Sequence, residues 1–131
     1  MFLLDTNTLI YYFKGQGQVA ERLLATPPDQ VAVSTVSLYE LETGLRKSAH
    51  SRQRRKQLDA LVSAARVWVL DQASAAAAAD VRAALESKGQ PIGPLDTLIA
   101  GIALAHGATL VTRNLREFSR VQRLAVTDWH G

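Results

Sequence analysis

Short apolar segments alternate with longer amphipathic segments along this chain. The short ones are rich in β-branched residues and end at polar or turn residues, which predicts strands at residues 2–4, 31–34, 67–70, 109–112 and 124–126. Between them, apolar residues recur at helical spacing, which predicts helices at residues 8–13, 18–25, 35–48, 52–65, 73–87 and 94–106. Strands alternating with helices are typical of a parallel sheet covered on both faces. We therefore expect an α/β fold, an α/β/α sandwich around a short, mostly parallel central sheet.

Turn residues mark the ends of the predicted helices, and no linker interrupts the chain. Pro27 and Pro28 end the second helix, while Gly89 and Gly107 suit the position just after the fifth and sixth helices. No repeat of domain size is present. A chain of 131 residues is long enough to bury a core of its own. We therefore expect a single domain, residues 1–131.

Composition narrows the chemistry. Cysteine is absent, which excludes disulfides, thiolate zinc sites and cysteine catalysis. The three histidines, His50, His106 and His130, lack the paired spacing of a zinc site, so a bound metal would be a hard cation held by oxygen. No apolar run approaches the roughly 18 residues of a membrane helix, and Asp5 interrupts any N-terminal signal segment. These features predict a cytoplasmic protein without membrane contact.

Three carboxylates from distant segments lie near predicted helix starts. Asp5 follows the first strand, Glu40 lies in the helix after the second strand, and Asp96 lies in the first turn after Pro94. Ligands of open parallel sheets bind at the carboxyl edge, where such residues gather. Two carboxylates about 5 Å apart repel by about 3 kcal/mol at an effective dielectric of 20. A Mg²⁺ or Mn²⁺ ion would relieve this repulsion and support phosphodiester chemistry.

Each acid also has a structural interpretation that the sequence leaves open. Asp5 could simply cap the following helix, Glu40 could be a solvated helix residue, and Asp96 could complement the helix dipole. Further polar residues would support a metal site at the same edge. They are Asn7, two residues after Asp5, and Thr112, Asn114 and Glu117, which follow the fourth strand. Arg113 and Arg116 would suit a rim that faces phosphate.

The basic residues are concentrated in one stretch. The net charge is +3 and the pI about 9.6. Residues 46–56 contain no acid and carry the basic residues Arg46, Lys47, Arg52, Arg54, Arg55 and Lys56. Such a cluster attracts phosphate backbones, although a solvated helix face or a turn between two helices is the favoured explanation for the cluster taken alone. Together with an acidic metal site, it favours a nucleic-acid substrate.

Four motifs in order resemble a known family. They are LLDTN at residues 3–7, STVSLYEL at 34–41, GPLDTLIA at 93–100 and LVTRN at 110–114, with an Asp-Trp pair at 128–129. This combination, which spans essentially the whole chain, resembles PIN-domain proteins and most closely the VapC ribonuclease toxins of bacterial toxin–antitoxin pairs. The resemblance implies a PIN-like α/β/α sandwich and a Mg²⁺- or Mn²⁺-dependent endoribonuclease that cuts RNA phosphodiesters, with tRNA suggested as the target.

The resemblance also assigns roles and partners. It makes Asp5, Glu40 and Asp96 the catalytic acids, with Asp5 and Asp96 as direct metal ligands and Glu40 completing the metal site, while Thr6 or Thr112 steadies the cluster. Many relatives carry an aspartate at the position of Asn114, and Glu117 could compensate for its absence here. The resemblance further implies a homodimer, inhibition by a cognate VapB-like antitoxin, and binding to promoter DNA only through the antitoxin complex.

Two other functions compete with this one. A catalytically weak PIN-like module could bind RNA or a partner protein without cutting, and Asn114 favours that alternative. A phosphatase could use Asp5 as its nucleophile. The residue two positions beyond Asp5 is Asn7 rather than an acid that could donate a proton, which disfavours the phosphatase.

Overall fold

The computed structural model describes all 131 residues. Five strands form one sheet in the order β3-β2-β1-β4-β5, and every pairing is parallel. The predicted mostly parallel sheet is therefore entirely parallel. The elements are β1 (Phe2–Leu4), α1 (Thr6–Lys14), α2 (Val19–Leu24), the 3-10 turn η1 (Pro28–Gln30), β2 (Val31–Ser34), α3 (Thr35–Lys47), α4 (Ser51–Ala64), β3 (Arg66–Trp68), α5 (Gln72–Ser87), α6 (Pro94–His106), β4 (Thr109–Val111), α7 (Leu115–Phe118) and β5 (Val126–Thr127).

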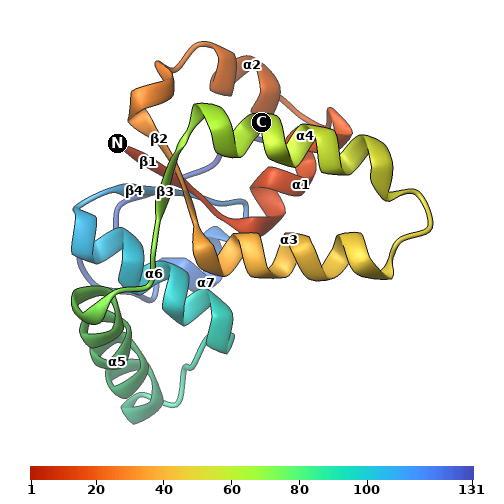
Figure 1. Cartoon of the computed structure of the whole chain (residues 1–131). Helices are drawn as coiled ribbons and strands as arrows, with labels where there is room; N and C mark the ends of the chain where they lie inside the picture. Colours follow the sequence, from red (N-terminus) through yellow and green to blue (C-terminus); the bar gives the residue numbers. More distant parts are fainter.

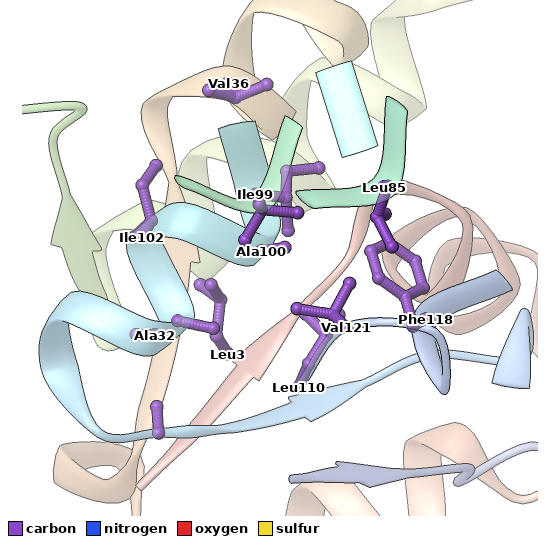
Figure 2. Close-up of a cluster of buried hydrophobic side chains, with 13 residues drawn as sticks. Leu3, Ala32, Val36, Leu85, Ile99, Ala100, Ile102, Leu110, Phe118 and Val121 are labelled. Atoms are coloured by element: carbon purple, nitrogen blue, oxygen red, sulfur yellow. The ribbon is translucent and has the colours of Figure 1, made fainter. Parts of the chain in front are cut away.

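Alternation along the buried strands creates two cores, one on each face of the sheet. Leu3 and Leu110 point into the core beneath α5, α6 and α7, which Figure 2 shows in close-up. Their neighbours Leu4 and Val111 point to the other face, which α1, α2 and α4 cover. Successive side chains of a strand point to opposite faces, so apolar residues in a row fill both cores. Figure 1 shows the helices that lie on the two sides of the sheet. The α/β/α sandwich expected from the sequence is confirmed.

Local signals in the sequence set the helix boundaries. Asp5, Ser34 and Asp71 each accept a hydrogen bond from the backbone N–H three residues later and so cap α1, α3 and α5. Pro94 begins α6, and Gly107 ends it with φ +62°, a backbone conformation that glycine adopts without strain. The Asp5 cap explains why α1 begins at Thr6 and not at the predicted residue 8.

Two strands end at other residues than predicted, because pairing with the neighbouring strand sets their ends and local composition does not. The third strand was predicted at residues 67–70, but β3 is Arg66–Trp68. Its neighbour β2 ends at Ser34, which pairs with Trp68, so Val69 and Leu70 have no residue of β2 to pair with, and both are exposed. The last strand is Val126–Thr127, later than the predicted 124–126, because Leu110 of β4 pairs with Val126. The short helix α7 was not predicted.

Candidate active site

The carboxyl edge of the central strands β1 and β4 places Asp5 beside Thr112. Leu4 pairs with Val111, and the Asp5 N–H donates to the Val111 carbonyl at 3.0 Å. Asp5 is buried, with 4% of its surface exposed, and its Oδ1 accepts from the Thr8 N–H at 2.8 Å. Asp5 therefore caps α1, and it is at the same time a buried carboxylate at the edge of the sheet.

Burial dominates the electrostatics of Asp5. Desolvation raises the pKa of its carboxyl, and the charge of Glu40 adds to the rise. Hydrogen bonding from the Thr112 side chain and from the Thr8 backbone N–H lowers the same pKa. The Thr112 hydroxyl also accepts from the Asn114 N–H at 3.0 Å, which orients it at the end of β4. Thr112 thus contacts the acid, and its supporting role in catalysis stays a prediction.

Glu40 is fixed by a chain of hydroxyl groups. Thr6 Oγ1 donates to Glu40 Oε1 at 2.6 Å, and Ser37 Oγ lies 2.9 Å from Thr6 Oγ1. Because the Thr6 proton goes to the carboxylate, Ser37 is the donor in the second bond. The Ser37 N–H in turn donates to the Ser34 hydroxyl at 3.0 Å. This arrangement turns the Glu40 side chain toward α1. Thr6 binds its Oε1 oxygen and not its Oε2 oxygen.

Asp96 is half-buried in the first turn of α6. Burial raises its pKa to about 6, and the charges of Asp5, Glu40 and Glu117 contribute to that rise. Asp5, which caps α1, Glu40 of α3 and Glu117 of α7 are therefore close enough to Asp96 to act on its carboxyl group. Asp96 thus lies near the acids of the other segments, and its role as a metal ligand stays a prediction.

The acids do not already surround a single point. No three acidic or histidine side chains are arranged to hold a cation together. Glu40 is drawn to Thr6, and Asp96 Oδ2 is turned toward Gly93, 3.5 Å from the position that a Cβ would occupy there. Joint ligation by Asp5, Glu40 and Asp96 would thus require the Glu40 and Asp96 side chains to rotate.

Other predicted residues are placed less centrally. Asn7 is exposed on the first turn of α1. Asn114 precedes α7, and its side chain makes no capping hydrogen bond. Ser37, which sequence reasoning did not select, is fully buried against Thr6. The feature of the sequence that could have indicated Ser37 is its position one helical turn before Glu40, on the same face of α3.

The basic cluster is partly structural. Arg55 of α4 contacts Glu42 of α3 at 2.6 Å and so ties the two helices together, while Arg46 contacts the same glutamate at 2.6 Å within α3. Arg54 lies over the Phe13 ring, 4.9 Å from its centroid. Arg55 therefore helps to hold α4 against α3, and Arg54 helps to hold α4 against α1. No helix of the protein is long and apolar enough to span a membrane.

Comparison with known proteins identifies the family. Residues 2–124 match the PIN domain family. The chain belongs to the PIN domain family. This PIN domain is 34% identical over 128 residues to the tRNA(fMet)-specific endonuclease VapC of Salmonella typhimurium, covering 98% of this chain and 97% of the relative. The resemblance to VapC proteins drawn from the sequence is confirmed.

Solved structures agree with the sequence comparison. The DNA-bound VapBC structure from Salmonella typhimurium matches this PIN domain with a TM-score of 0.91 at 35% identity, covering 98% of this chain and 97% of the other. VapBC2 from Rickettsia felis, bound to a DNA fragment from its promoter, gives 0.90 at 32% identity with 98% of each chain covered. A PIN domain of this kind leaves no support for the phosphatase alternative.

Proposed function

We propose that this PIN domain is the toxin of a VapBC-type pair and a divalent-metal-dependent endoribonuclease of the cytoplasm. The observation that carries the proposal is the acidic edge: Asp5, Glu40 and Asp96 come from three distant segments and influence one another electrostatically. Likeness over nearly the whole chain to a tRNA(fMet)-specific endonuclease supports RNA as the polymer and tRNA as its class.

The donor set suits Mg²⁺ or Mn²⁺. The acids at this edge supply carboxylate oxygens only, and the chain contains no cysteine, so a hard cation is favoured over zinc or copper. Asp5 and Asp96 would bind the ion directly, with Glu40 completing the site. When bound, such an ion activates water and neutralises charge on the phosphodiester. The raised pKa of Asp96 marks a carboxylate that a cation would stabilise in its charged form.

The protein's own residues supply position and polarity. Thr6 holds one oxygen of Glu40, so Glu40 Oε2 is the atom presented for a metal or a water molecule. Thr112 and the Thr8 N–H orient Asp5, while Asn7, Asn114 and Glu117 would contact water or RNA around the acids. Fixing these groups before substrate arrives avoids reorganisation during the reaction.

Partners follow from the relatives. The VapBC structures contain an antitoxin together with the toxin, and we propose that a VapB-like antitoxin inhibits this chain by covering the acidic edge. A homodimer of the toxin and binding to promoter DNA through the antitoxin complex belong to the same proposal. Purification from cells that express an adjacent small antitoxin-like reading frame would test the pairing.

The decisive experiment measures RNA cleavage. Purified protein is incubated with a tRNA transcript and Mg²⁺ or Mn²⁺, with EDTA and with the Asp96→Asn variant as controls. Cleavage that needs the metal and is lost in the variant supports the proposal. Binding of tRNA without cleavage, unchanged by Asp96→Asn, would instead indicate the weakly catalytic binding module that Asn114 favours.

A further inference from the structure

A second polar cluster lies beside the acidic edge and involves a tyrosine, an arginine and a histidine. Arg113 Nη1 lies 3.0 Å from His130 Nε2, and the Arg113 guanidinium lies over the Tyr11 ring, 5.9 Å from its centroid. The Tyr11 and His130 rings meet edge to face, with centroids 5.0 Å apart. Because arginine can only donate, His130 Nε2 is the acceptor of this bond and its ring proton is on Nδ1.

The chain holds His130 firmly although it is the penultimate residue. Its carbonyl accepts from the Gln18 N–H at 2.8 Å, and its own N–H donates to Asp128 Oδ1 at 2.8 Å. Gly17, with φ +63°, packs so closely that an added Cβ would lie 2.3 Å from the His130 carbonyl oxygen. The imidazole is therefore a fixed support for Arg113.

The cluster lies within reach of an RNA strand bound at the acids. Thr112 directly follows β4 beside Asp5, and Arg113 is the next residue along the chain. Tyr11 belongs to α1, the helix that Asp5 caps. Arg113 is exposed, and after its bond to His130 it keeps further N–H donors for a ligand.

We propose that Arg113, oriented by Tyr11 and His130, binds a phosphate of the RNA strand next to the bond that is cut. A planar guanidinium held over an aromatic ring and bonded to a fixed imidazole loses less conformational freedom on binding, and it can pair with phosphate through two parallel hydrogen bonds. Such a contact positions the strand without reading its sequence. This inference rests on the proposed ribonuclease function and assigns Arg113 as a phosphate-binding residue, with Tyr11 and His130 as positioning residues.

The test compares binding of a fluorescent tRNA transcript to full-length variants, all carrying Asp96→Asn to prevent cleavage. Arg113→Ala should weaken binding several-fold and reduce the slope of log K against log salt by roughly 0.7–0.9, as expected for one lost phosphate contact. Arg66→Ala is the matched control, because this exposed arginine begins β3 at the opposite edge of the sheet. It should leave both quantities unchanged.

Two further variants test the positioning role. His130→Ala should weaken binding when Arg113 is present and have no further effect in the Arg113→Ala background, since coupled residues are not additive. His130→Gln, which keeps an acceptor, should restore most of the affinity. In the cleaving protein, Arg113→Ala should raise KM and leave kcat nearly unchanged, because the contact persists from ground state to transition state.

The outcomes separate this inference from the proposed function. Failure of the wild type to cleave RNA with Mg²⁺ would contradict the ribonuclease, and the binding comparison would still test Arg113. If the wild type cleaves and Arg113→Ala behaves like Arg66→Ala, the inference about Arg113 is wrong. Unchanged RNA binding with weaker capture of the co-expressed antitoxin would also overturn it and assign the cluster to the antitoxin.

Discussion

Replacing Asp96 by asparagine should make the metal-free protein more stable at neutral pH while abolishing its activity. Asp96 is half-buried beside other acids, and its pKa is raised to about 6 from an ordinary 3.8. No hydrogen bond from the chain offsets the burial and the repulsion. Asparagine has nearly the same shape and carries no charge, so it removes both unfavourable effects.

The pH dependence follows from the direction of the shift. Because the folded state binds the Asp96 proton more tightly than the unfolded state does, stability falls as the pH rises from about 4 through about 6. The cost is fully present at neutral pH and absent below the unfolded pKa. A shift of about two units corresponds to about 3 kcal/mol, which solvent screening of a half-buried group reduces to roughly 1–2 kcal/mol.

Urea unfolding in EDTA at pH 7.5 and pH 4 measures the effect. Asp96→Asn should raise the free energy of unfolding by roughly 1–2 kcal/mol at pH 7.5 and leave it nearly unchanged at pH 4. Asp80→Asn serves as the control, because this carboxylate is exposed on α5 and should change little at either pH. Only Asp96→Asn should change the free energy of unfolding by different amounts at the two pH values.

Metal supplies the complementary measurement. A ligand present at ten times its dissociation constant stabilises the state that binds it by about 1.4 kcal/mol. Millimolar Mg²⁺ or Mn²⁺ should therefore raise the melting temperature of the wild type and not that of Asp96→Asn. The reasoning is refuted if the variant is less stable than the wild type at pH 7.5, or if its gain in stability is equally large at pH 4.

Three more predictions concern other parts of the molecule. Asp5→Asn should abolish cleavage and toxicity in cells with little loss of stability, since asparagine still caps α1, whereas Asp5→Ala should also lose about 1 kcal/mol in thermal unfolding. Thr6→Val should lower kcat/KM about tenfold or more by releasing Glu40, and Thr6→Ser should retain most activity; equal rates for the two would contradict the role of the hydroxyl. Gly101→Ala should cost about 1–3 kcal/mol in urea unfolding, because its Cβ would lie 2.6 Å from atoms of α5, while Gly44→Ala in α3 meets nothing within 4 Å and should be neutral or stabilising.

Much of the fold was predictable because its signals are local. The β-branched apolar runs, the caps at Asp5 and Ser34 and the glycine after α6 each act within a few residues. The α6 boundaries, Pro94–His106, match the prediction at both ends. By contrast, β3 and β5 shifted because a strand ends where its neighbour ends, and that neighbour is distant in the sequence.

The candidate site shows the same division. The sequence pointed to Asp5 because it follows a strand and to Asp96 because it lies in a first helical turn, and Glu40 was indicated by its motif at residues 34–41. Their orientation was not visible: the turn of Glu40 toward Thr6 and the support from Ser37 depend on how α3 packs against α1.

The sequence by itself determined which residue types occupy the sheet edge, because strand and helix periodicity fix where each side chain of an element points. Only the tertiary structure decided which of these side chains meet. It joined Arg113, Tyr11 and His130 from three separate parts of the chain. Such contacts arise when packed elements bring distant residues together, and a pattern read along one segment carries no information about its neighbours in space.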